Sequence, residues 1–301
     1  ESSHMDRLKK TIFYKYILFV RVAFPQLEFS VEVINGRHIL LLVPVSEQLP
    51  TVIFALVAER IVGMGPKSLL FAIPNRFSDF NDENVNPENI IEIAEKGKFN
   101  AIVFQKGIAE KYNEEIKKSK IPLILKLNGK TNLYKGEAFA EPICSIKEAI
   151  KLGASAVGFT IYIGSKHEAH MMKHFADIEK EAHENGLPVI AWIYPRGKEI
   201  KNDTSREIMA YAARVGLEIG ADIVKLKWNG NVNDLKWIVK SAGKCKVVIA
   251  GGAKKSEKEL LKQVKEIIDA GAAGIAVGRN VWQADKPIEI ADKIRGVIFG
   301  T

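Results

Sequence analysis

From residue 67 onward, short apolar segments alternate with longer stretches of helical periodicity, and this alternation restricts the possible folds more than any other feature. Strict alternation implies that the strands pair in parallel. Eight such units in roughly 235 residues predict a (β/α)8 TIM barrel over 65–301, and a doubly wound sheet is the alternative. The predicted strands are 67–73, 101–105, 122–128, 156–162, 188–194, 223–228, 246–250 and 274–277. The predicted helices are 87–96, 108–118, 146–152, 167–185, 205–219, 233–241, 257–270 and 287–299.

Helix boundary signals agree with this division of the chain. Asn86-Pro87 and Ser256 have the side chains that favour helix starts. Glycine, which favours helix ends, follows five of the predicted helices, at Gly153, Gly186, Gly220, Gly243 and Gly271.

Residues 6–64 do not share this rhythm and are predicted to form a β-meander plus a helix. Segments 11–24, 27–34 and 37–45 are rich in β-branched and aromatic residues, and Asn35-Gly36 indicates a type I′ hairpin. Helical spacing over 49–62 ends before Gly63. The extension can be an added subdomain, an oligomer contact or a poorly ordered segment. Residues 1–5 are set apart, because Glu1–His4 before Met5 are typical of an expression-vector remnant.

Composition excludes several classes of protein. The net charge is +8, but the lysines are spread along helices instead of forming a basic arm, which argues against nucleic-acid binding and suits anionic, phosphorylated small substrates. No apolar run approaches the roughly 18 residues of a membrane span. Cys144 and Cys245 form no paired motif, so we expect neither a disulfide framework nor a thiolate metal site, and we expect a cytoplasmic protein.

The strand at 223–228 carries amines within an apolar sequence. Alternation places Ile223, Lys225 and Lys227 on one face of the strand. Val224, Leu226 and Trp228 lie on the other, apolar face. A lysine between apolar neighbours inside a barrel is desolvated, which favours its neutral, nucleophilic form. Lys225 is therefore a candidate for Schiff-base formation with a carbonyl substrate. The alternative is a lysine at a strand end that only extends to solvent.

Other polar residues are predicted on the inward face near the carboxyl ends of the strands, where barrels of this kind perform their chemistry. A purely structural barrel would fill these positions with Val, Ile and Leu. Tyr194 is the candidate for proton transfer, with a capped core tyrosine as the alternative. The inward set is Lys126, Asn128, Thr160, Tyr162, Trp192, Tyr194, Lys225 and Lys227, and Pro195-Arg196-Gly197 follows the fifth strand directly.

The seventh and eighth predicted strands end in glycine turns, at Gly251-Gly252 and at Gly278-Arg279. Barrels often bind phosphate at these two positions through glycine N–H groups. Two turns and the bidentate guanidinium of Arg279 together favour a phosphate site.

These segments resemble the archaeal-type class I, Schiff-base fructose-bisphosphate aldolase family over about residues 65–299. The segments that carry the resemblance are VFQKGIA at 103–109, LKLNGKT at 125–131, YIGS at 162–165, WIYPRG at 192–197, VKLK at 224–227, AGG at 250–252 and VGRNVWQ at 277–283. The resemblance implies that Lys225 forms the Schiff base, that Tyr194 donates the proton and that the glycine turns hold a substrate phosphate. It implies neither a metal nor another cofactor. The expected site also includes Trp192, Pro195, Arg196, Lys126 and Lys227, and a homo-oligomer is expected.

One departure from the family concerns the end of the first strand. The family has an Asp there, whereas this chain reads AIPNRFSD at 72–79 and places Pro74 at that position. Three hypotheses stay open: an aldolase acting on a ketose phosphate such as fructose 1,6-bisphosphate; a transaldolase or synthase of the same family, making 6-deoxy-5-ketofructose 1-phosphate or a related aromatic precursor; and a sugar-phosphate-binding barrel with impaired catalysis.

Overall fold

The computed structural model describes residues 27–34, 37–44, 67–72, 86–131, 133 and 136–300. The chain divides into two units, Glu1–Ile53 and Phe54–Thr301. The predicted strand at 11–24 and the predicted helix at 49–62 lie outside the described residues, as do Pro74 and its neighbours in the segment 73–85.

The first unit contains a β-hairpin. Strands β1 (Leu27–Ile34) and β2 (Arg37–Pro44) pair antiparallel from Leu27 with Pro44 to Ile34 with Arg37. The last pair leaves a two-residue connection, which is the length that the Asn35-Gly36 motif predicts. The predicted hairpin is therefore confirmed.

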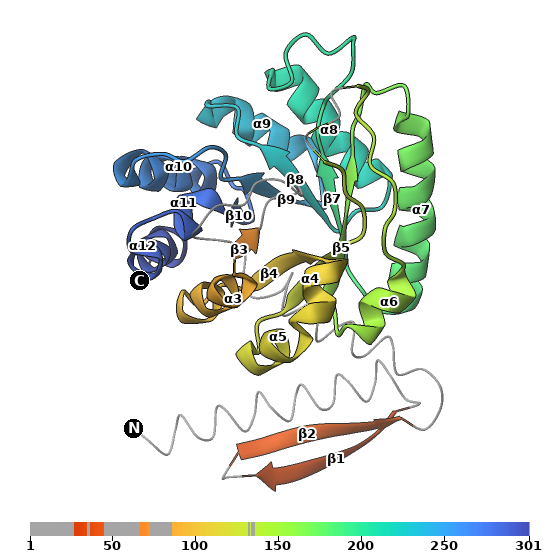
Figure 1. Ribbon diagram of the computed structural model, residues 1–301, viewed down its shortest axis with the longest axis vertical. Coiled ribbons are helices and arrows are strands. Elements are labelled where there is room, and N and C mark those ends of the chain that lie inside the picture. Colours follow the sequence, from red (N-terminus) through yellow and green to blue (C-terminus); the bar gives the residue numbers. More distant parts are fainter. Residues whose placement is uncertain are drawn as a thin grey trace. The chain divides into compact units, whose positions relative to one another are not determined.

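The second unit is a closed barrel of eight parallel strands in the order β10-β3-β4-β5-β6-β7-β8-β9 (Figure 1). The predicted TIM barrel is confirmed, and closure between β10 and β3 excludes the doubly wound alternative. The strands are β3 (Ser68–Ala72), β4 (Ala101–Gln105), β5 (Leu123–Lys126), β6 (Ala156–Ile161), β7 (Val189–Ile193), β8 (Ile223–Lys227), β9 (Lys246–Ala250) and β10 (Gly274–Val277).

Helices surround the barrel (Figure 1) and begin and end largely where the sequence predicts. Asn86 caps the first of them by accepting a hydrogen bond from the Glu88 N–H, and Ser256 forms a capping box with Glu259. The five predicted terminating glycines all have positive φ. The helices are α3 (Pro87–Lys96), α4 (Lys106–Lys111), α5 (Asn113–Ser119), α6 (Ile146–Lys151), α7 (Glu168–Glu184), α8 (Arg206–Glu218), α9 (Val232–Ser241), α10 (Glu257–Asp269), α11 (Arg279–Trp282) and α12 (Pro287–Phe299).

The predicted helix at 108–118 is wrong in one respect, because two helices occupy this stretch. Tyr112 leaves the helical conformation at φ −114° and ψ 29° between α4 and α5. The Asn113 side chain donates a 3.0 Å hydrogen bond to the Leu152 carbonyl, which ties the second helix to a neighbouring loop. This long-range contact has no signature in local periodicity. The short helix α11 was also not predicted.

The barrel interior has an apolar layer with polar side chains beyond it. Small and medium apolar residues form this layer together with the Trp192 indole. Among the barrel-strand positions whose side chains the structure describes, the buried polar residues at the strands and their carboxyl ends are Lys126, Asn128, Thr160 and Lys225. The apolar layer consists of Leu70, Ala101, Val103, Ile124, Ala156, Ile190, Trp192, Ile223, Val248 and Ala276. The outer faces of the strands pack against the helices in the main core.

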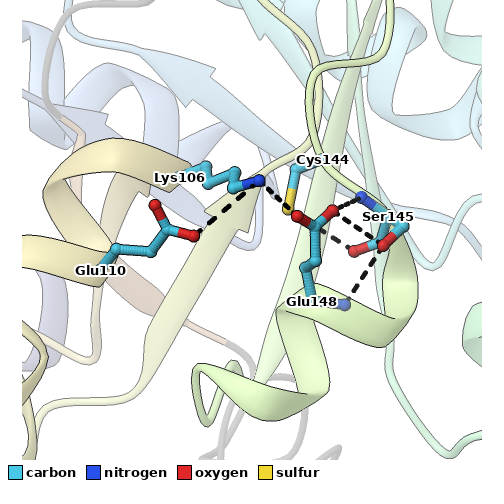
Figure 2. A network of polar contacts seen from close by, with 5 residues as sticks. All are labelled: Lys106, Glu110, Cys144, Ser145 and Glu148. Carbon is cyan, nitrogen blue, oxygen red and sulfur yellow. Dashed lines mark hydrogen bonds and ion pairs between the residues drawn. The ribbon is translucent and has the colours of Figure 1, made fainter.

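An ion-pair network joins α4 to α6 (Figure 2). Lys106 pairs with Glu148, whose carboxylate also accepts hydrogen bonds from the Ser145 N–H and hydroxyl, both at 2.9 Å. The hydrogen bond from Lys106 lowers the pKa of Glu148 to about 2. Burial is the main cause that raises the pKa of the adjacent Cys144 thiol to about 11, so this thiol is neutral at pH 7. The network is therefore structural.

Both cysteines are free and buried. Burial raises the pKa of Cys245 to about 12. Among the residues that the structure describes, no helix has both the length and the hydrophobicity that a membrane crossing requires.

Candidate active site

Lys225 lies in the barrel beside Tyr194 and Trp192. Its strand neighbour in the register of β7 and β8 is Trp192. The Lys225 side-chain amine donates a 3.5 Å hydrogen bond to the Tyr194 hydroxyl and lies 5.5 Å from the centroid of the Trp192 ring. Only 6% of Lys225 is exposed. The predicted inward direction of Lys225 is confirmed, and the alternative of a lysine that extends to solvent is excluded.

Burial also changes the charge state of this amine. Removal of the ammonium from water lowers the pKa of Lys225 from 10.5 to about 7. At neutral pH about half of such groups are uncharged, compared with roughly one in three thousand for a lysine with the ordinary pKa. Lys225 can therefore act as a nucleophile without a separate base to deprotonate it.

Gly158 makes room for the Trp192 indole. A Cβ atom at Gly158 would lie 1.6 Å from an indole carbon of Trp192, so any side chain there would displace the ring. The register pairs Gly158 with Lys126 on β5, and the Lys126 amine lies 5.4 Å from the same indole centroid. One aromatic ring thus contacts the amines of both Lys126 and Lys225. Gly158 was not among the predicted site residues, although a glycine inside a strand is the signal of a close approach.

Asn128 connects β5 and β6 with the loop that follows β5. Its side-chain amide donates to the carbonyls of Ala140 (3.0 Å) and Thr160 (2.9 Å). Its side-chain oxygen accepts from the Thr160 N–H at 2.8 Å and from the Lys126 amine. Lys126 also donates to the Asn128 carbonyl at 2.8 Å. The sequence placed Asn128 on the inward face but did not predict this network.

The pKa of Lys126 is lowered well below its ordinary value. Burial is the main cause, and the positive charge of Lys225 acts in the same direction. Lys126 is therefore a hydrogen-bond donor held by Asn128, and burial disfavours its charged form.

Aromatic and cationic side chains lie beside the Tyr194 ring. The rings of Tyr162 and Tyr194 stack at 6.3 Å, and the Arg196 guanidinium lies 5.5 Å from the first ring and 5.9 Å from the second. Pro195, which lies between Tyr194 and Arg196 in the sequence, is buried. The Arg196 N–H donates to the Ile163 carbonyl at 2.8 Å, which extends the contact between the two segments beyond the strands. Arg196 is thereby directed toward the two tyrosines.

Lys227 forms an ion pair with Asp203, a residue of the loop between β7 and α8. About a quarter of the Lys227 side chain (27%) and 40% of the Asp203 side chain are exposed. Lys227 was predicted from the sequence, whereas Asp203 was missed, because no local pattern connects a loop carboxylate with a strand 24 residues away.

The two glycine turns after β9 and β10 lie side by side. Gly252 has φ +79°, its carbonyl accepts a 3.4 Å hydrogen bond from Arg279, and Arg279 is half-buried. The Gly251 N–H already donates to the Ala276 carbonyl at 2.9 Å. Gly278 is the residue that precedes α11. The Arg279 side chain thus joins the turn after β10 to Gly252, as the predicted convergence of Gly251, Gly252, Gly278 and Arg279 requires.

Comparisons with known proteins show which family this chain resembles. Residues 70–284 match the DeoC/LacD family aldolases. The chain is 45% identical over 249 residues, 80% of this chain and 93% of the relative, to the class 1 fructose-bisphosphate aldolase of Thermoproteus tenax. It is 34% identical to the fructose-bisphosphate aldolase/6-deoxy-5-ketofructose 1-phosphate synthase of Methanocaldococcus jannaschii, over 77% of this chain and 80% of that relative.

Solved structures give the same result. A crystal structure of an archaeal fructose 1,6-bisphosphate aldolase matches with a TM-score of 0.77 at 43% identity, over 82% of this chain and 100% of that one. A second archaeal structure, whose catalytic Lys is covalently bound to the carbinolamine intermediate of its substrate, matches with a TM-score of 0.75, also at 43% identity, over 82% of this chain and 100% of that one. The resemblance that the sequence segments indicated is thus confirmed. This chain belongs to the DeoC/LacD aldolase family.

Proposed function

We propose that this protein is a metal-independent Schiff-base aldolase that cleaves or forms a ketose phosphate such as fructose 1,6-bisphosphate. The observation that carries the proposal is the buried Lys225 amine, with a pKa lowered to about 7, 3.5 Å from the Tyr194 hydroxyl. A nucleophile and a proton-transfer group are thereby held within reach of one carbonyl. The relatives named as fructose-bisphosphate aldolases support the choice of substrate.

The proposed chemistry begins when the neutral Lys225 amine attacks the ketone carbon and forms a carbinolamine. Loss of water, with a proton supplied by Tyr194, gives an iminium. The Tyr194 phenolate left by that step then takes the proton from the hydroxyl on C4. The C3–C4 bond breaks, the aldehyde leaves, and the bonding electrons pass into the iminium to give an enamine. Protonation of the enamine at C3 and hydrolysis of the resulting iminium release the ketone product and restore the amine.

The phosphate group is proposed to bind at the turns after β9 and β10. The Gly251 N–H is already bonded to the Ala276 carbonyl. Phosphate binding at the first turn is therefore assigned to Gly252, which is exposed. Arg279 is the charged donor beside it. Lys227, Arg196, Trp192 and Pro195 are proposed to contact the rest of the substrate, and Lys126 to keep the indole in place.

The second candidate is a synthase or transaldolase that uses the same amine but another aldehyde. The Methanocaldococcus jannaschii relative, which has both names, supports it. Pro74 supports a third candidate, an enzyme with impaired catalysis, because the side chain has no acidic group. We further propose a cytoplasmic homo-oligomer, and size-exclusion chromatography with light scattering tests the oligomeric state.

Borohydride trapping tests the proposed function. The protein is incubated with fructose 1,6-bisphosphate or dihydroxyacetone phosphate, reduced and digested, and the mass of each lysine-containing peptide is measured. We expect the adduct on Lys225, none in Lys225→Met, and an adduct still on Lys225 in the control Lys227→Met. A label on Lys126 or Lys227 in the wild-type protein would contradict the assignment. Products formed with several aldehydes then distinguish an aldolase from a synthase.

A further inference from the structure

Three metal-ligating side chains meet on the outside of the barrel, on elements that carry none of the proposed catalytic residues. His170 and His174 are one turn apart on α7, and Glu141 lies in the segment between β5 and α6. One ligand atom from each of the three lies within 4.8 Å of the others. Figure 1 shows α7 on the outer surface of the barrel. Glu141, His170 and His174 together form the histidine cluster.

The separations in the histidine cluster are those of ligands around one small ion. The Nε2 atoms of His170 and His174 are 2.9 Å apart. Glu141 Oε1 lies 3.8 Å from His170 Nε2, and Glu141 Oε2 lies 3.5 Å from His174 Nε2. Ligand atoms of a tetrahedral zinc ion with bonds of about 2.0–2.1 Å are roughly 3.3 Å apart. One ligand atom from each residue already lies within 4.8 Å of the other two, so a rotation that brings one Glu141 oxygen closer to both rings would place all three atoms on one ion.

Without an ion, the two imidazoles can share one hydrogen bond between their Nε2 atoms. Two Nε2 atoms at 2.9 Å can share only one proton, so one ring must present its bare nitrogen to the other. A divalent ion accepts the lone pairs of both neutral rings and the charge of Glu141 together.

The backbone on both sides of Glu141 is already fixed. Ala140 accepts the 3.0 Å hydrogen bond from the Asn128 side chain, and Pro142 forms a β-bridge with Asn128. The ring of Phe139 packs 5.6 Å from the ring of His170. The loop therefore presents the Glu141 carboxylate to α7 before any ion binds, which reduces the entropy cost of binding.

The chemistry of the ligands selects the type of ion. Two imidazoles and one carboxylate suit Zn²⁺ and similar first-row transition ions, whereas Mg²⁺ and Ca²⁺ prefer oxygen ligands alone. Between a third and just over half of each side chain is exposed (56% for His170, 32% for His174 and 53% for Glu141), so an ion can enter and water can complete its coordination.

We propose that the histidine cluster binds one divalent transition ion of the zinc type, with three protein ligands and water. The ion joins the β5–α6 segment to α7. Its role is structural, because the amine chemistry proposed for Lys225 requires no metal. The ion would stabilise the β5–α6 segment. The same segment contacts Asn128 through Ala140 and Pro142, and Asn128 in turn holds the Lys126 amine.

The test uses the full chain after removal of metal with a chelator. Zn²⁺ binding is measured by calorimetry, and Co²⁺ is added as a spectroscopic probe because its visible absorption distinguishes four from six ligands. We expect one equivalent of each ion to bind, an intense four-coordinate cobalt spectrum, and a melting temperature that rises on addition of Zn²⁺.

Matched variants locate the ion. His170→Gln and His174→Gln are each expected to weaken Zn²⁺ binding at least tenfold and to abolish the four-coordinate cobalt spectrum, and Glu141→Gln to weaken binding. His167→Gln, on the same surface but outside the cluster, and Glu137→Gln, in the same segment as Glu141, are the controls and should bind like the wild type. Circular dichroism of each variant verifies folding.

Unchanged affinity in the double variant His170→Gln/His174→Gln would overturn the proposal, because the ion would then be held elsewhere, for example by His4 or His38. A six-coordinate cobalt spectrum in the wild type, or no equivalent bound at micromolar Zn²⁺, would also overturn it. Borohydride trapping of Lys225 with and without the chelator tests the proposed function separately.

Discussion

Gly158 and Trp192 lie on neighbouring strands so close together that a Cβ atom at Gly158 would be 1.6 Å from the indole. The ring occupies the space that a side chain at Gly158 would take. From there it lies 5.4 Å from the Lys126 amine and 5.5 Å from the Lys225 amine, measured to its centroid. The absence of one side chain on β6 thus determines where an aromatic ring contacts two buried amines.

Gly158→Ala is expected to destabilise the protein and to slow imine formation. The added methyl group must displace the Trp192 ring, since both strands are held by the barrel, and overpacking of this kind costs about 1–3 kcal/mol. Urea unfolding and the rate of borohydride trapping measure the two effects. Gly107→Ala on α4 is the control, because no atom outside its chain neighbours and the backbone of its own helix lies within 4 Å of the position that a Cβ atom at Gly107 would take. Equal stability and trapping rates in the two variants would contradict the role assigned to Gly158.

The rate of imine formation is expected to follow the neutral fraction of Lys225. With a pKa of about 7, that fraction rises roughly ninetyfold between pH 5 and pH 8 and then levels off. A lysine with the ordinary pKa of 10.5 would still gain about tenfold per pH unit at pH 9. Trapping under single-turnover conditions from pH 5 to pH 9.5 measures the profile. A rate that keeps rising tenfold per unit above pH 8 would mean that burial does not lower this pKa.

Lys225→Met is expected to stabilise the protein while it abolishes imine formation. The folded-state pKa of about 7 lies below the unfolded value of 10.5, so between these pH values the unfolded state binds the additional proton. The contribution of Lys225 to the free energy of unfolding therefore rises with pH across this window, and it is least favourable below pH 7. Replacement by an apolar side chain should gain about 1–4 kcal/mol near pH 6.

This gain should shrink as the pH approaches 10.5. Denaturant unfolding of the wild type and of Lys225→Met at pH 6 and pH 9.5 tests the prediction. Lys227→Met is the control, because Lys227 pairs with Asp203 in the wild type. Its difference in stability from the wild type should not show the pH dependence expected for Lys225→Met. A wild-type protein more stable than Lys225→Met at pH 6 would refute the desolvation argument.

Arg279→Ala is expected to weaken phosphosugar binding by roughly 1.5–3 kcal/mol, the range for hydrogen bonds to charged groups. Arg295→Ala removes the same charge from α12, where Arg295 donates to the Lys98 carbonyl, and should bind like the wild type. Calorimetry with a non-cleavable ketose phosphate analogue measures both dissociation constants. An equal loss in the two variants would indicate a general effect of charge instead of a phosphate site at Gly252 and Arg279.

Pro74→Asp is expected to raise turnover without a large change in imine formation. Acid–base groups contribute about 10²- to 10⁴-fold, and proline has neither an acidic group nor a backbone donor. Steady-state cleavage of fructose 1,6-bisphosphate and borohydride trapping separate the two steps. High activity in the wild type, or no gain in Pro74→Asp, would show that another acid, for example Asp79, performs this role.

Sequence periodicity by itself determined the order and the type of the barrel elements. Alternation fixes which face of a strand each residue occupies, and a glycine with positive φ ends a helix, because both are properties of the local backbone. The inward position of Lys225 and the turns at Gly252 and Gly278 were therefore predictable. The resemblance in seven short segments added the family.

The tertiary structure decided the features that depend on contacts between distant residues. The pKa of Lys225 follows from how completely neighbouring strands exclude water, and the position of Trp192 follows from the missing side chain of Gly158. The Asn128 network, the Lys227–Asp203 pair and the break at Tyr112 join residues from separate elements. The histidine cluster likewise unites a loop carboxylate with two rings on a helix, because chain packing, and not sequence spacing, brings Glu141 to them.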